Sequence, residues 1–477
     1  MKDSKLYNTL SSFSTKQLNR FDKFVRSPYF NSNESLIKLN EIIHGLLKGN
    51  KEITEKAAWE SIFLKKDFDQ AKFRKMLSDL VTLSESFLIQ EELAGSHLLM
   101  QNLLLQSIKK NRVVTIQKKV VTNSIKEADR RKEQSSEYFL QRFRIEKNQY
   151  NLTTHFEKKS KKKTITAAEE VQSLSKKLDI FYLIEKMRHG SDLLTWSGMY
   201  KADLDLSQFE FTAKLIERSD YLNIPAINIY YNIYKAFKEE NQTKYFFQIK
   251  ELMLEYLDQF PFEEQQEIYD SMISYCIIKV NSGEKDFIPE ALEMYTTGID
   301  TGISLIDGEL SPTAFRNIVV IALRYGYMDF AINFINEKAD LINHKFRSNA
   351  LNFNLARVYF YKKEHDRVLE YLNQVDFEDV WYNINSKAML IATYYETEEF
   401  DALESLLTSY AAFIRREKSL DEARRQRYLN FVNLVKKLIK IFPVTNEKLD
   451  KIRDEVKATK AIINRTWLYE RIELLRP

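Results

Sequence analysis

Glycine and proline are scarce in this chain. Its 477 residues include 10 Gly and 7 Pro, where average usage would give about 33 Gly and about 24 Pro. Hairpin-rich β proteins, dinucleotide-binding sheets and phosphate-binding loops need glycine where the backbone turns sharply or approaches a ligand. The shortage therefore disfavours these folds and predicts an all-α protein.

Cysteine and histidine are scarce as well. The single cysteine, Cys276, excludes an intrachain disulfide framework and fits a reducing compartment. The six histidines never stand at the short spacings of zinc ligands, and no Gly-rich phosphate loop, nucleophile elbow or HExxH motif occurs. We therefore expect no enzyme activity, no cofactor and no metal site. Cys276 lies on an apolar stripe, so we predict that it packs in the core. His365 lies in the charged string KKEHD, so we predict that it occupies a solvated turn.

Long apolar runs are missing too. No uncharged, predominantly apolar run reaches the roughly 18 residues of a membrane span, and the N-terminus lacks the apolar region of a secretory signal. The expected location is the cytoplasm, without membrane contact.

The net charge of +4 conceals blocks of opposite sign. Residues 101–165 hold 17 Lys and Arg against 6 Asp and Glu, whereas residues 201–310 hold 9 against 21. A third block, 411–477, holds 17 against 9. Because the first two blocks nearly cancel, we favour docking of one on the other, within one molecule or between two copies. The alternative is that the basic block binds phosphate groups.

Local signals divide the chain into three regions. Ser14 and Gln17 have capping-box spacing, Thr54 and Asp69 are expected helix N-caps, and Gly49 is expected just after a helix end. We predict an N-terminal helical domain (1–96), a basic long-helix region (97–165) and a helical repeat region (166–477). The repeat region is expected to begin with a new helix capped by Thr166 and Glu169. The string RFDKFVRSPYFN at 20–31 resembles the start of bacterial helical proteins to which we attach no activity.

Residues 312–417 show an internal period of 35 to 37 residues. Leu355, Tyr359, Val368 and Leu372 recur 35 residues later as Leu390, Tyr394, Leu403 and Leu407, and a preceding unit has the same spacings at Phe315, Ile318, Ala322, Gly326, Ala331 and Ile335. This pattern resembles the tetratricopeptide repeat, in which two helices and a turn recur every 34 residues. The terminal Pro of the motif is missing, and Val319, Ala356 and Ile391 replace its Gly. The resemblance implies a curved solenoid of α-α hairpins.

The resemblance also implies a binding surface on the first helix of each hairpin. The expected partner-binding residues are Arg316, Arg324, Phe353, Arg357, Tyr361, Asn385 and Tyr395. Arg and Tyr are enriched at interaction hot spots, so we predict a scaffold that binds a protein or peptide, with self-association left open. A groove that clamps a C-terminal carboxylate is matched only in part, by Arg316 and Asn354.

The alternative function is association with nucleic acid. Its candidate residues are Lys109, Lys119, Arg130, Arg131, Lys161 and Lys162. A helix-turn-helix regulator is a related option, because a helix with Trp59 precedes a basic helix with Phe73. Both options predict a strong dependence of binding on salt concentration.

Overall fold

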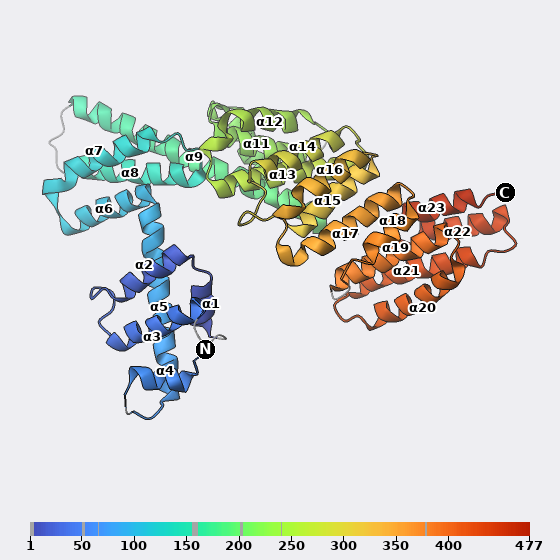
Figure 1. Cartoon of the computed structure of the whole chain (residues 1–477). Helices are drawn as coiled ribbons and strands as arrows, with labels where there is room; N and C mark the ends of the chain where they lie inside the picture. Colours follow the sequence, from blue (N-terminus) through green and yellow to red (C-terminus); the bar gives the residue numbers. More distant parts are fainter. Residues whose placement is uncertain are drawn as a thin grey trace. The chain divides into compact units, whose positions relative to one another are not determined.

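The computed structural model confirms the all-α class (Figure 1). It describes residues 4–49, 53–64, 66–154, 161–200, 204–239, 241–376 and 379–477. These ranges contain 23 α-helices, three short 3-10 helices and no β-strand. Backbone contacts divide the chain into two compact units, residues 1–260 and 261–477.

The N-terminal helices of the first unit share one core. They are α1 (Lys5–Ser11), α2 (Thr15–Val25), α3 (Glu34–Leu47), α4 (Glu55–Ile62) and α5 (Gln70–Gly95). The apolar faces of all five contribute, and their largest fully buried side chains include Phe21 and Phe73. The predicted helix starts are confirmed: Ser14 forms a capping box with Gln17, and Thr54 and Asp69 accept hydrogen bonds from their first-turn amides. The predicted boundary at 96/97 lies between α5 and α6.

Helices of moderate length follow, and then a long one. They are α6 (His97–Asn111), α7 (Val114–Arg130), α8 (Ser136–Thr154) and the 40-residue α9 (Lys161–Tyr200). The prediction of a helix start at Thr166 is wrong, because α9 already begins at Lys161. Lysine has a high helix propensity, so the residues before Thr166 continue the helix rather than form a loop. The predicted boundary at 165/166 therefore lies inside α9.

Three further helices complete the first unit. They are α10 (Ser207–Glu217), α11 (Pro225–Lys238) and α12 (Lys244–Tyr256), and α11 packs against both α9 and α12. Gly190 of α9 lies where this packing is closest. A Cβ atom at Gly190 would stand 2.9 Å from the ring of Tyr234 and 3.0 Å from that of Phe209. Glycine is therefore required for α9 to approach α10 and α11.

The second unit is a succession of helix pairs (Figure 1). The helices are α13 (Phe262–Ser282), α14 (Phe287–Asp300), α15 (Pro312–Arg324), α16 (Met328–Lys338), α17 (His344–Tyr361), α18 (His365–Leu372), α19 (Val380–Glu396), α20 (Phe400–Arg416), α21 (Glu422–Ile439), α22 (Asn446–Ala458) and α23 (Arg465–Leu474). Each of α15, α17 and α19 packs against its own hairpin partner, and α17 also packs against both α15 and α19. The predicted burial of Cys276 on α13 is confirmed.

The turns inside three of these hairpins have the same backbone geometry. One residue of each turn is left-handed: Gly326 (φ 83°), Lys363 (φ 61°) and Glu398 (φ 60°). At each turn the following amide donates to a carbonyl five residues back in the chain, with Ala322, Tyr359 and Tyr394 as acceptors at 2.9, 3.0 and 2.9 Å. This is the hydrogen bond of a Schellman motif. The turns recur with the same 37- and 35-residue spacing as the sequence pattern.

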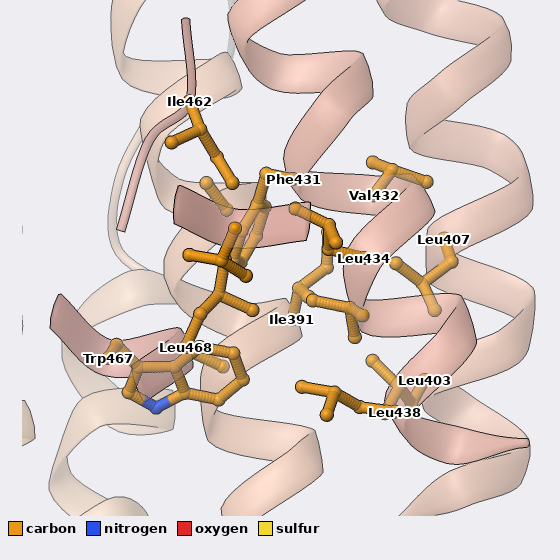
Figure 2. Close-up of a cluster of buried hydrophobic side chains, with 14 of the residues drawn as sticks. Ile391, Leu403, Leu407, Phe431, Val432, Leu434, Leu438, Ile462, Trp467 and Leu468 are labelled. Atoms are coloured by element: carbon orange, nitrogen blue, oxygen red, sulfur yellow. The ribbon is translucent and has the colours of Figure 1, made fainter. Parts of the chain in front are cut away.

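The C-terminal helices share a large apolar core (Figure 2). Leu403 and Leu407 of α20 meet Phe431, Leu434 and Leu438 of α21 there, and Trp467 and Leu468 of α23 belong to the same cluster. Since Phe431, Leu403 and Leu468 are all fully buried, α23 is an integral part of the unit. Within the described residues, no helix has both the length and the apolar character that a membrane crossing needs.

Candidate functional site

Three neighbouring helices of the second unit, α15, α17 and α19, bring arginines and aromatic rings together. We call this set the arginine–aromatic surface, and it consists of Arg316, Arg324, Phe353, Arg357, Tyr361, Trp381, Tyr382 and Asn385. On α17 the members follow one another at i, i+4 and i+8, which places them on one helix face. The same spacing joins Trp381 to Asn385 on α19.

Aromatic rings support two of the arginines. The guanidinium carbon of Arg357 lies 4.8 Å from the ring centre of Phe353, and that of Arg316 lies 4.6 Å from the ring centre of Trp381. Phe353 is 1% exposed and packs edge-on against Trp381, 5.3 Å away between centroids, and against Tyr382, 5.5 Å away. Such contacts hold a guanidinium in place without neutralising its charge.

Arg357 is unusual because its half-buried guanidinium has no counter-ion in the described part of the chain. Its Nη1 atom is inaccessible to solvent and has no hydrogen-bond partner. Burial lowers the pKa of Arg357 to about 10, and the positive charges of Arg316 and Arg324 act in the same direction, while Tyr361 and Tyr382 oppose them. Among the described residues, no carboxylate lies within ion-pair distance of Arg316, Arg324 or Arg357.

Helix α21 reaches the arginine–aromatic surface through Tyr428. Burial raises the pKa of Tyr428 on α21, whereas a hydrogen bond with Asn385 and the nearby charges of Arg427, Arg424 and Arg316 act to lower it. Arg424 and Arg427 are both exposed on α21, and Arg424 lies 3.3 Å from a carboxylate oxygen of Asp421.

Six of the seven residues predicted to bind a partner belong to this surface, and they differ in how exposed they are. Phe353 is buried beneath Arg357, whereas Tyr361 is 42% exposed. The seventh, Tyr395, lies elsewhere, with its ring 5.5 Å from that of Trp467 and packed against the C-terminal core. The proposed clamp residue Asn354 is 1% exposed and donates to the carbonyl of Ala350 at 2.7 Å. Its amide nitrogen therefore serves its own helix, while its Oδ1 atom is buried without a hydrogen-bond partner.

The sequence reasoning missed Trp381 and Tyr382. Trp381 precedes Asn385 by one helical turn on the same face, so extending the predicted surface by one turn of α19 would have found it. Tyr382 is 7% exposed, and its place beside Phe353 depends on how α17 and α19 pack. Burial raises the pKa of Tyr382 to about 12, which keeps the phenol neutral near pH 7.

The prediction that His365 occupies a solvated turn is wrong. Its side chain is 19% exposed, and its Nε2 atom lies 3.2 Å from a carboxylate oxygen of Glu396, which is itself only 3% exposed. Three other groups converge on this carboxylate. Trp467 Nε1 donates at 2.7 Å, Lys363 Nζ at 2.9 Å, and a guanidinium nitrogen of Arg471 stands 3.4 Å away. The arrangement ties the α17–α18 turn and α23 to the end of α19.

The residues predicted to bind nucleic acid are dispersed in the first unit. Lys109 lines a groove between α6 and α8, and Lys119 and Arg130 are exposed on α7. Arg131 stands 3.8 Å from Glu127 and 3.6 Å from Glu133. Lys161 and Lys162 belong to α9, but their side chains lie outside the described residues.

If the basic block docked on the acidic residues of the first unit, ion pairs would join residues 101–165 to residues 201–260. Arg142 pairs with Asp129 and Glu146, which belong to the basic block itself. Within the described part of the first unit, none of the basic side chains of 101–165 pairs with a carboxylate of 201–260. The exposed cations of the block are therefore not neutralised by that segment.

The helix-turn-helix candidate corresponds to α4 and α5. The Nζ atom of Lys72 lies 5.0 Å from the ring centre of Phe63 and 5.9 Å from that of Trp59. This cation therefore packs on aromatic rings of its own domain. Phe73 of α5 is fully buried in the N-terminal core.

No protein-family model matches this chain, and neither the curated proteins nor the solved structures contain a match. Among the described residues, no group of three or more His, Cys, Asp or Glu side chains is placed to hold a metal ion.

Proposed function

We propose that this chain is a non-catalytic, tetratricopeptide-like repeat protein of the cytoplasm that binds an acidic segment of a protein partner on the arginine–aromatic surface. The observation that carries the proposal is the guanidinium of Arg357, which has no ion pair within the described residues and whose Nη1 atom is buried without a hydrogen-bond partner. Burying a charge without a partner costs several kcal/mol in folding. A protein that keeps such a group on an interaction surface has a use for it in recognising a negative group.

The hairpin turns support the repeat part of the proposal. Their hydrogen bonds recur with the sequence period, and the pattern residues Ala331, Val368 and Leu403 in the second helices of the hairpins are all 0% exposed. Repeats of this kind align the first helices of successive hairpins and leave side chains on each free for a partner.

The surface also has the composition of a recognition site. Guanidinium groups supply several donors in a fixed plane, which suits carboxylates, and the aromatic rings offer large contact areas with little loss of side-chain freedom. Arg316, Arg324 and Arg357 carry like charges on adjacent helices, so an acidic segment lying across α15 and α17 relieves their repulsion.

A peptide array tests the proposal. The full-length protein, fluorescently labelled, is applied to synthetic peptides of equal length that carry acidic, neutral or basic side chains around a common set of apolar residues. We expect selective retention on acidic peptides, and a marked loss of retention for the double variant Arg316→Met/Arg357→Met. The matched control is Arg453→Met, which removes an arginine from α22 that is 53% exposed.

Two results would contradict the proposal. One is equal retention on acidic and neutral peptides, and the other is retention of the double variant at the level of the control. Tyr395→Phe should behave as the wild type, because that ring packs in the core rather than on the surface.

A further inference from the structure

The first unit has an open groove between α6 and α8 that is lined by basic side chains. Its volume is about 680 Å³, and the residues that line it are Gln106, Lys109, Lys110, Arg112, Phe143, Arg144, Lys147, Asn148 and Asn151. This volume falls within the range of small-molecule sites, roughly 300 to 1,000 Å³.

Buried contacts hold the two walls of the groove in register. The side-chain amide of Asn102 on α6 donates to the backbone carbonyl of Gln141 on α8 at 3.1 Å and to its side-chain oxygen at 2.6 Å. Leu105, Ile108 and Ile145 are all nearly inaccessible beside this pair. The groove residues therefore stand on two packed helices, except Arg112, which lies in the turn just after α6.

The charge of the groove is of one sign. Five of its nine lining residues are Lys or Arg, and none is acidic. Elsewhere in the basic block Arg131 and Arg142 have carboxylate partners, but in the described residues no ion pair involves any of the five lining cations. Like charges held at this density attract a polyanion and release its counter-ions when it binds.

The groove also contains an aromatic ring and amide groups. Phe143 is partly exposed, and Lys147 Nζ lies 5.4 Å from its ring centre. An aromatic ring next to cations is the usual platform on which an unstacked base lies while its phosphates are neutralised. Gln106, Asn148 and Asn151 supply amide donors and acceptors of the kind that pair with base edges.

We propose that the α6–α8 groove binds single-stranded nucleic acid, with the lining cations on its phosphates and Phe143 stacked on a base. A duplex keeps its bases stacked and leaves Phe143 without a role, so the single strand is the better match. The inference is independent of the protein-binding proposal, because the groove and the arginine–aromatic surface lie on different units of the chain.

Fluorescence anisotropy of a labelled twelve-nucleotide oligouridylate with the full-length protein tests the inference. The logarithm of the binding constant should fall linearly with the logarithm of NaCl concentration. A slope of about −3.5 is expected if all five cations contact phosphates, because each phosphate contact in a single strand contributes about −0.7.

Three variants separate the groove from general electrostatics. Lys110→Glu/Arg144→Glu should weaken binding by about tenfold or more and flatten the salt slope. Phe143→Leu should weaken binding about 5- to 150-fold at an unchanged slope, since it removes the stacking face but keeps an apolar side chain. The control Lys126→Glu/Lys132→Glu makes the same charge change at two exposed lysines of the basic block that do not line the groove, and should bind like the wild type. Circular dichroism confirms that each variant is folded.

Three outcomes would overturn the inference. The first is a control variant that binds as weakly as the groove variant, which would indicate attraction to net charge alone. The second is Phe143→Leu binding as tightly as the wild type. The third is equal competition by a duplex or by polyglutamate, which would assign the groove to another class of ligand.

Discussion

Replacing Arg357 by methionine should stabilise the protein while removing the group proposed to bind the partner. Methionine keeps an unbranched apolar stem over Phe353 and removes the buried charge. The fall in the pKa of Arg357 from 12.5 to about 10 corresponds to about 3 kcal/mol of unfavourable free energy in the charged form. Because the Arg357 side chain is only half-buried and its contact with Phe353 is favourable, we expect a gain of about 1 to 3 kcal/mol in the free energy of unfolding.

The measurement is urea denaturation of the full chain, followed by circular dichroism, with Arg324→Met as the matched control. Arg324 is exposed on the neighbouring helix, so its replacement should change the free energy of unfolding by less than about 0.5 kcal/mol. If Arg357→Met is less stable than the wild type by about 1 kcal/mol or more, the guanidinium has a stabilising partner and the reasoning fails.

The dependence of this gain on pH has a definite sign. Folding lowers the pKa of Arg357 below its unfolded value, so the folded state favours the neutral form and is destabilised while the group is charged. The destabilisation is fully present below about pH 10 and is lost as the pH rises through that value. The difference in unfolding free energy between Arg357→Met and the wild type should therefore narrow between about pH 10 and about pH 12. A difference that stays constant over this range contradicts the assignment.

Two further substitutions test how the fold is held together. Glu396→Gln should lower the free energy of unfolding by about 3 kcal/mol or more, because it leaves Arg471 without its buried counter-charge and weakens the acceptor for Trp467. Hydrogen exchange should rise in α23, and unchanged exchange there would count against this account. Gly190→Ala should lower the free energy of unfolding by about 1 to 3 kcal/mol, because the new methyl group overlaps the ring of Tyr234. Thermal unfolding followed by circular dichroism measures this loss, and an unchanged melting temperature would mean that the ring moves aside freely.

Local sequence patterns predicted the helices, their caps and the composition of the surface. The helix start at Ser14 depends on neighbours in the chain. The repeat period alone aligned Arg316 with Phe353 and Arg324 with Tyr361, 37 residues later. Burial depends on packing between distant segments, and the pattern does not contain that information. His365 looked solvated because its neighbours in the sequence are charged, yet the fold brings it to Glu396. Tyr395 was assigned to the surface because its register is correct, but α23 packs against it.

The hairpin turns explain how a chain with so little glycine changes direction so often. A left-handed Lys or Glu costs roughly 1 to 2 kcal/mol relative to glycine in the folded state. The same residue restricts the unfolded chain, which returns about 0.4 to 1 kcal/mol. At Lys363 the ion pair with Glu396 offsets part of the remaining cost. At Glu398 the left-handed backbone keeps a net cost relative to glycine, so Glu398→Gly should stabilise its turn more than Lys363→Gly stabilises the other.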